Sequence, residues 1–282
     1  MTTIIACIDG SPSAPAVCDY AAWASQQLSA PLVLLHVLDR ALYPQSGDLS
    51  GNIGLDSREQ LLEELAKLDE KRARLARQQG DLTLDAARQR VLDAGYAEPQ
   101  VLHRHGNLVE TLLEQESDLR LLVIGKRGED STRPSQVIGS QLESAIRSMH
   151  RPVLVTPTHF KIPRSVLLAF DGSATADKGI DMICASPLLQ GLPIHLVMVG
   201  ANNSQQQQLA AAAQRLQAAG FQVHTAALSG EVEDSLLAYQ QEHQLDLLAM
   251  GAYGHSRIRE FFIGSTTTTM LHRCKTPLLM LR

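Results

Sequence analysis

The sequence predicts an α/β protein of two tandem, doubly wound domains, each with a five-stranded parallel sheet covered by helices on both faces. Two observations support this fold class. Short, nearly continuous apolar runs alternate with helical stretches, which is typical of parallel strands buried on both faces. The same runs also occur twice in the same order, which indicates a duplicated domain. With 282 residues, the chain is long enough for two domains that each bury a core.

Four apolar motifs of the first half return in the second half, and each contributes one predicted strand. The glutamine- and alanine-rich stretch 205–220 predicts a helix that ends at Gly220, and a further strand follows at 221–228. We therefore expect the order βαβαβαβαβ in each copy, with domains at residues 1–158 and 163–282. The matching motifs are TIIACIDGS (3–11) with SVLLAFDGS (165–173), PLVLLHV (31–37) with PIHLVMV (193–199), LLVIGKRG (121–128) with LLAMGAYG (247–254), and RPVLVTP (151–157) with TPLLMLR (276–282).

The first copy is longer than the second. Asp9 to Gly125 spans 116 positions and Asp171 to Gly251 spans 80, so the first copy holds 116 − 80 = 36 additional residues. They fall at about 43–80, where a loop rich in Gly, Ser and Pro precedes a helical pattern.

The inserted helix is expected over residues 57–79. Ser57 and Gln60 have the spacing of a capping box, and Glu63–Lys67 is a favourable pair four residues apart. One stripe of the helix is apolar. This stripe has two interpretations: a solvated helix packed on its own domain, or a helix that binds a partner. Its members are Leu61, Leu65, Leu68 and Leu75.

Composition argues against several classes of protein. The net charge is −5 and the pI is about 6.0, which gives no attraction to nucleic acid or to an anionic membrane. No apolar run approaches the ~18 residues of a membrane span, and the N-terminus lacks the basic region of a signal peptide. We therefore expect a cytoplasmic protein with neither a nucleic-acid nor a membrane partner. The four cysteines form no CxxC pair and are expected to be free thiols: Cys7, Cys18, Cys184 and Cys274.

A glycine loop in the second copy is the strongest sign of a binding site. GAYGHSRIREFFIGSTTTT (251–269) follows the strand-like run LDLLAM, and it has the spacing G-x2-G-x9-G-S. A strand, a glycine loop and a helix N-terminus in this order bind phosphate, because backbone N–H groups and the helix dipole point at the anion. Asp171 ends the first strand and Gly251 ends the fourth, so both should flank the crevice where the strand order reverses. Neither GxxxxGK[ST] nor GxGxxG is present.

Together with AFDGS (169–173) and the terminal TPLLMLR, this loop resembles that of the universal stress protein family in its tandem two-domain form. The resemblance covers nearly the whole chain apart from the inserted loop and helix, and it implies a Rossmann-like fold of the adenine nucleotide alpha hydrolase type. It also implies that the second copy binds ATP, with Mg²⁺ as a candidate accompanying ion. The residues that it places at the adenine, ribose and phosphates are Ala169, Asp171, Val199, Met250, Gly251, Tyr253, Gly254, Gly264, Ser265 and Thr266.

Tyr253 departs from the family pattern, because an arginine often occupies this position. Arg257 and Arg259 have two interpretations: they compensate on the phosphate side, or they are solvated loop charges. The run of hydroxyl residues from Ser265 to Thr269 also has two interpretations. The resemblance implies a group that accepts phosphate from ATP, and the local pattern alone indicates a helix start rich in capping hydroxyls.

The first copy departs further from the motif. Ten residues, not nine, separate Gly128 from Gly139, and Glu129 and Asp130 stand where phosphate oxygens would approach. Two carboxylates beside a polyphosphate cost coulombic energy unless a cation intervenes. We expect a site that holds another ligand, holds ATP weakly, or is structural. Its candidate residues are Asp9, Val37, Gly125, Gly128, Gly139 and Ser140.

His103 and His105 lie two positions apart and should share one face of a strand. They are either a surface pair or two ligands of a metal site for which no third ligand is evident. Asp9 and Asp171 suit hydrogen bonding to ribose better than general-base catalysis, because no activated nucleophile accompanies them.

These observations favour a nucleotide-responsive stress protein that acts through conformation or partners and is not primarily an enzyme, with at most slow ATPase or autophosphorylation activity. Two alternatives stay open: a scaffold that binds no nucleotide, and a hydrolase or deacylase that uses a metal at His103 and His105.

Each copy ends in an apolar strand that should lie at a sheet edge and need cover. In single-domain members of the family this strand forms a dimer, and the resemblance implies the same contact within one chain. We expect residues 152–156 to lie antiparallel to 277–281 as a pseudo-dimer with a two-fold axis. For a homodimer of the whole chain, the inserted helix at 57–79 is one candidate contact.

Overall fold

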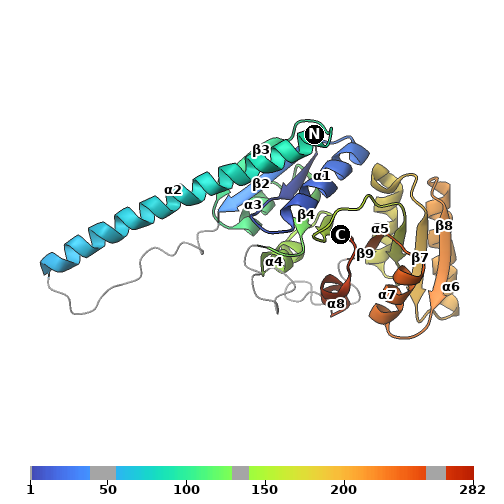
Figure 1. The fold of residues 1–282 in the computed structure, drawn as a ribbon. Helices are drawn as coiled ribbons and strands as arrows, with labels where there is room; N and C mark the ends of the chain where they lie inside the picture. Colours follow the sequence, from blue (N-terminus) through green and yellow to red (C-terminus); the bar gives the residue numbers. More distant parts are fainter. Residues whose placement is uncertain (1, 39–54, 129–139, 252–264) are drawn as a thin grey trace.

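The computed structural model describes residues 2–38, 55–128, 140–251 and 265–282, and it shows an α/β protein built on one ten-stranded sheet (Figure 1). The predicted class and the alternation of strands and helices are confirmed. The elements are β1 (Thr3–Cys7), α1 (Ala14–Leu28), β2 (Leu32–Leu38), α2 (Leu55–Asp93), β3 (Gln100–His105), α3 (Leu108–Glu114), β4 (Leu119–Gly125), α4 (Ser140–Ser148), β5 (Val153–Thr156), β6 (Val166–Ala169), α5 (Ala174–Ala185), the 3₁₀ helix η2 (Pro187–Leu189), β7 (Ile194–Val199), α6 (Asn203–Ala218), β8 (Val223–Leu228), α7 (Val232–Glu242), β9 (Leu247–Gly251), α8 (Ser265–Arg273) and β10 (Leu278–Leu281).

The strand order shows the duplication directly. It reads β3-β2-β1-β4-β5-β10-β9-β6-β7-β8, so the second half repeats the first in reverse. We call residues 1–158 the first repeat and residues 163–282 the second repeat, after the domains proposed from the sequence. Within each repeat the paired strands are parallel, and the first strand lies between the second and the fourth. Strand order therefore reverses beside β1 and beside β6.

The two repeats join through their last strands. β5 and β10 pair antiparallel, with Leu278 opposite Val155 and Met280 opposite Val153. All residues of both strands are buried. The antiparallel pairing expected for 152–156 and 277–281 is thus observed, and it joins the five parallel strands of each repeat into one continuous sheet. The pairing covers two apolar edges that would otherwise attract another chain.

Helices cover both faces of this sheet in two layers. One apolar core lies under α1, the C-terminal part of α2, α5 and α6, and the other lies under α3, α4, α7 and α8. Each core contains residues of both repeats, for example Leu121 with Leu279 in the first and Val153 with Met280 in the second. Burial of apolar side chains therefore continues across the seam between the repeats.

The inserted helix differs from the expectation. Instead of a separate helix at 57–79, α2 is one helix of 39 residues that continues into the domain, whereas its counterpart α6 has 16. The difference of 39 − 16 = 23 residues accounts for most of the 36 additional residues, and the expected loop at about 43–54 lies outside the described residues. Figure 1 shows α2 reaching far beyond the sheet. In the described part of the chain, no helix is long and apolar enough to cross a membrane.

Gly80 lets this helix pass close to the sheet. A Cβ atom at Gly80 would lie 2.7 Å from the ring of His103 and 2.8 Å from that of His36, too close for any other residue. The helix therefore keeps a glycine at an interior position where that residue normally costs stability.

The segment between the repeats is held by side chains of both. Phe160 packs edge to face on Tyr20 of α1, with ring centroids 4.7 Å apart. Asp246, a buried residue next to β9, accepts a hydrogen bond from the backbone N–H of Arg164 at 3.0 Å and forms an ion pair with Lys161. The connection thus contacts α1 of the first repeat and the start of β9 in the second.

Two neighbouring leucines of α3 test how much the helical layers contribute to stability. Leu112 is 0% exposed and Leu113 is 43% exposed. Leu112→Ala should lower the free energy of unfolding by about 2–5 kcal/mol, because it leaves a cavity in the core. Leu113→Ala should change it by less than about 0.5 kcal/mol. Urea unfolding followed by circular dichroism checks both, and equal effects would contradict the packing described for α3.

Candidate functional site

The candidate site of the second repeat lies where β6 and β9 end side by side. Leu168 pairs with Ala249 in parallel, so Ala169 and Asp171 leave the sheet beside Met250 and Gly251. β7, on the other side of β6, ends at Val199 on the same edge. The structure therefore brings together the strand-end residues that the sequence predicted for a crevice.

The chain order places a helix N-terminus on this side of the sheet, because α8 connects β9 to its parallel neighbour β10 and must start where β9 ends. α8 begins at Ser265, and its first turn contains Thr266 and no acidic residue. Ser265 is exposed and Thr266 is half-buried, whereas Thr267 is buried in the domain. Free N–H groups and the positive end of the helix dipole favour an anion here. The predicted Tyr253, Gly254 and Gly264, and the candidate Arg257 and Arg259, lie outside the described residues.

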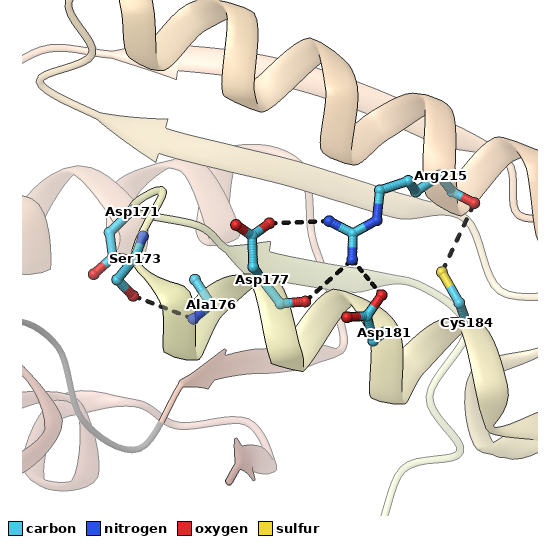
Figure 2. A network of polar contacts seen from close by, with 7 residues as sticks. All are labelled: Asp171, Ser173, Ala176, Asp177, Asp181, Cys184 and Arg215. Atoms are coloured by element: carbon cyan, nitrogen blue, oxygen red, sulfur yellow. Dashed lines mark hydrogen bonds and ion pairs between the residues drawn. The ribbon is translucent and has the colours of Figure 1, made fainter.

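Asp171 is part of a tight turn that starts α5. The backbone N–H of Ser173 donates to Asp171 Oδ1 at 2.9 Å, and Ser173 Oγ caps α5 by accepting from the N–H of Ala176 at 3.1 Å (Figure 2). Gly172 between them has φ +74°, a conformation that favours glycine. The sequence DGS thus orients the Asp171 carboxylate, which is exposed, at the end of β6.

Arg215 holds α5 in place from α6. Its guanidinium donates to Asp177 Oδ1 at 3.0 Å and to the backbone carbonyl of Asp177 at 3.3 Å, and it also pairs with Asp181 (Figure 2). The Cys184 thiol donates to the carbonyl of Arg215 at 3.7 Å. The hydrogen bond with Asp181 raises the pKa of Arg215. Sequence reasoning missed this cluster: two acids four residues apart on a predicted helix were the available signal, but their partner is 38 positions from Asp177 and 34 from Asp181.

The first repeat has the same turn but a tighter packing beside its fourth strand. The N–H of Ser11 donates to Asp9 Oδ1 at 3.1 Å, as in the second repeat. Among the described residues, a Cβ atom at Gly125 would lie 2.8 Å from Ser13 Cβ, whereas at Gly251 the nearest atom would be Thr175 Cγ2 at 3.5 Å. The residue at the start of the helix after the first strand therefore packs more closely on the fourth strand in the first repeat than in the second.

Two more features separate the first site from the second. Gly128 lies over Asp9, since its Cβ would be 3.4 Å from Asp9 Oδ2. α4, which begins at Ser140, has Glu143 in its first turn, and a carboxylate there opposes an anion at the helix N-terminus. Val37 lies half-buried near the end of β2. Glu129, Asp130 and Gly139 lie outside the described residues.

Lys126, next to Gly125, links the first loop to the second repeat. Its Nζ donates to the carbonyls of His272 and Cys274 at 2.9 Å each, at the C-terminal end of α8. A cation at this end complements the helix dipole and satisfies carbonyls that the helix leaves unpaired. Burial lowers the pKa of Lys126. Because α8 starts on the side of the sheet where β9 ends, it runs from that side toward the loop after β4 of the first repeat.

Six histidines of the described residues form two clusters, and the first lies near the first crevice, because His36 Nδ1 hydrogen-bonds the carbonyl of Ile8, next to Asp9, at 2.7 Å. As expected, His103 and His105 lie on one face, with stacked rings 5.4 Å apart. His103 also hydrogen-bonds Asp81 of α2 at 2.7 Å, and its ring lies 5.3 Å from that of His36. Sequence reasoning identified neither His36 nor Asp81 as a neighbour, because they come from other elements. No group of three or more His, Cys, Asp or Glu side chains in the described ranges is arranged to hold a metal ion.

The second cluster surrounds His195 of β7. Its Nδ1 hydrogen-bonds Tyr239 Oη at 2.9 Å, and its ring centroid lies 5.0 Å from that of His224 and 5.3 Å from that of His243. Burial and the two neighbouring imidazoles lower the pKa of His195. The cluster thus favours a neutral His195 that contributes to packing between the sheet and α7.

Comparisons with known proteins agree on one family. The model of the Universal stress protein family matches residues 1–157 and 200–282. The Universal stress protein Slr1230 of Synechocystis sp. (strain ATCC 27184 / PCC 6803 / Kazusa) is 39% identical over 287 residues and covers 100% of both chains. A crystal structure of a universal stress protein from Archaeoglobus fulgidus DSM 4304 covers 99% of this chain and 98% of its own, at 19% identity and a TM-score of 0.69. A universal stress protein in complex with cAMP covers 43% of this chain and 98% of its own, at 23% identity and a TM-score of 0.38.

The contact of Lys126 with α8 can be tested by substitution. Lys126→Met removes the donor to two carbonyls at a helix end, which should lower the free energy of unfolding by about 1–3 kcal/mol. Arg127→Met is the matched control, because Arg127 is adjacent and exposed, and it should have little effect. Urea unfolding of both variants checks this expectation, and a loss of equal size in the two variants would contradict it.

Proposed function

The chain belongs to the universal stress protein family, and on that premise we propose that it is a nucleotide-responsive protein that binds ATP mainly in its second repeat. The observation that carries this proposal is the edge formed by Asp171, Val199 and Gly251 beside the N-terminus of α8. Such an edge combines an acceptor for ribose hydroxyls with donors for phosphate. The class of function is regulatory binding, with at most slow ATPase or autophosphorylation activity.

Each part of the proposed site matches one part of the nucleotide. The exposed Asp171 carboxylate, oriented by its turn, suits the ribose hydroxyls, with Ala169 and Met250 beside it. The backbone at Val199 suits the adenine edge. Ser265 and Thr266 at the start of α8 offer hydroxyl and N–H donors to phosphate. The family motif adds Tyr253, Gly254 and Gly264, and bound Mg²⁺ would neutralise part of the phosphate charge.

The first repeat is proposed as a weaker site or as a site for another ligand. Ser13 and Val17 fill the space beside Gly125, and Gly128 lies over Asp9. Glu143 places negative charge in the first turn of α4, where the second repeat has none. These features reduce both the space and the attraction for a polyphosphate.

The two crevices are proposed to influence each other through the seam. Strands run parallel within each repeat and antiparallel across β5–β10, so the carboxyl ends of the two halves lie at opposite edges of the sheet. α8 connects these edges, because it starts at one crevice and its C-terminal end binds Lys126 of the other loop.

Lys126→Met should therefore weaken ATP binding in the second repeat, whereas unchanged affinity would count against this route of coupling.

Substitution of Gly251 tests the proposed ATP site. Among the described residues, a Cβ there would make an ordinary contact of 3.5 Å with Thr175, so we expect Gly251→Val to fold, which circular dichroism checks, and to weaken ATP binding by at least about tenfold, as it crowds the ligand. Isothermal titration calorimetry measures the affinity. Gly128→Val in the first repeat, which is equivalent in position to Gly254→Val, is a control and should leave the tight site unchanged.

Gly254→Val and Gly264→Val extend this test to the predicted loop, where each should remove binding. Wild-type affinity in all three second-repeat variants would contradict the site.

The inequality of the two repeats predicts the stoichiometry. Titration should show about one tight ATP per chain, because α8 has no acidic residue in its first turn whereas α4 of the first repeat has Glu143 there. Equilibrium dialysis with ATP, and with cAMP for comparison, gives this number. Two sites of equal affinity would show that the first crevice has been misinterpreted.

A further inference from the structure

The long helix α2 has two different apolar faces, and only one of them belongs to the fold. Leu84, Ala87 and Val91 in its C-terminal part are buried in the core under α1 and the sheet. The N-terminal part extends beyond the domain (Figure 1). A second row of leucines runs along the helix from there.

This second row repeats every seven residues. Leucine stands at 61, 68, 75 and 82, with Leu65 in the intervening position of the first heptad. The side chains of Leu68, Leu75 and Leu82 are 42%, 52% and 70% exposed. Leu82 and the buried Leu84 are two positions apart, which is a rotation of about 200° around a helix, so the two rows face different directions. We call residues 61, 65, 68, 75 and 82 the leucine ridge.

The charges beside the ridge change sign halfway along it. Residues 59–70 hold five acidic side chains and one basic one, a net charge of −4, and residues 71–77 hold four basic side chains, a net charge of +4. Pairs within the helix, such as Lys67–Glu63 at 2.8 Å, are exposed and contribute little to stability. The separation into an acidic and a basic half is therefore not explained by the isolated helix.

We propose that the leucine ridge binds the same ridge of a second copy of this chain, as an antiparallel two-stranded coiled coil. A repeat of seven with leucine in each heptad is the pattern by which helices pair. Antiparallel alignment centred near residue 70 places each acidic half beside a basic half, and it sets Leu65 of one chain against Leu75 of the other. Parallel alignment would instead place like charges together and Arg72 against Arg72.

The position of the helix agrees with this arrangement. Residues 58–82 span about 37 Å at 1.5 Å per residue, which is about three and a half heptads. The domain lies at the C-terminal end of this segment. Antiparallel pairing thus puts the two domains at opposite ends of the coiled coil, where they do not collide. Arg72 lies between Leu68 and Leu75 on the helix face that carries the leucine ridge. Its aliphatic stem can cover Leu68 of the second copy while the guanidinium reaches solvent.

The salt dependence of self-association tests both the contact and its orientation. Sedimentation equilibrium of the full chain, from ~1 to ~100 µM, should show a monomer–dimer equilibrium whose dissociation constant rises at least about threefold between ~50 and ~500 mM NaCl, because salt screens the opposite charges. A monomer at every concentration would overturn the proposal. This is the result expected if the leucine ridge instead packs on another segment of the same chain. A dimer that tightens with salt would overturn the antiparallel orientation.

A pair of variants shows whether the ridge is the contact. Leu75→Asp places a charge on the ridge and should give a monomer. Ala73→Asp is the matched control, because this exposed residue is two positions away on the other side of the same helix, and it should keep the dimer. Circular dichroism should show equal helix content in both variants. Wild-type dimerisation by Leu75→Asp, or equal loss in both variants, would overturn the assignment to the ridge, whatever the outcome for ATP.

Discussion

The antiparallel pairing of β5 with β10 is the contact on which the rest of the structure depends. It joins two parallel sheets into one, and it buries two apolar edges that neither repeat could leave in water. Because it reverses strand direction at the seam, it also decides that the two crevices open at opposite edges of the sheet. Both core layers continue across it, so that the repeats are held by packing as well as by backbone hydrogen bonds.

The two repeats share a strand order and a turn after the first strand, but the side chains around their strand ends differ. The turn that orients Asp9 and Asp171 is the same in both repeats. The packing on the fourth strand is not, since Ser13 lies closer to Gly125 than Thr175 lies to Gly251. Small differences in packing can change the surface at a strand end while the fold stays the same.

α2 and α8 show how helices extend the function of a repeat beyond its own crevice. α8 contacts both edges of the sheet, with hydroxyls at its start and Lys126 at its end. α2 passes the sheet at Gly80, where two histidine rings leave no room for a side chain, and then leaves the domain as a charged helix with a leucine ridge. α8 thus links the second repeat to the first loop through Lys126, and α2 carries the leucine ridge that we propose as the contact with a second copy.

The sequence by itself determined the class of fold and the duplication, and it placed Asp171, Val199 and Gly251 at the ends of neighbouring strands. These depend on local patterns: apolar runs long enough for buried strands, and DGS or glycine at strand ends where the backbone must turn. It also indicated the edge strands, because an apolar last strand needs cover. The predicted loop residues beyond Gly251 belong to the same pattern, and they stay predictions.

Only the tertiary structure decided the contacts between segments far apart in the chain. Lys126 hydrogen-bonds a carbonyl at the end of α8, and Arg215 hydrogen-bonds Asp177. The ring of His103 contacts that of His36. These positions are too far apart in the chain for any local sequence pattern to connect them. The continuity of α2 through Gly80 is of the same kind, since an interior glycine lowers helix propensity and only the rings of His36 and His103 explain its presence. Propensity and periodicity describe neighbours along the chain, whereas packing is decided by neighbours in space.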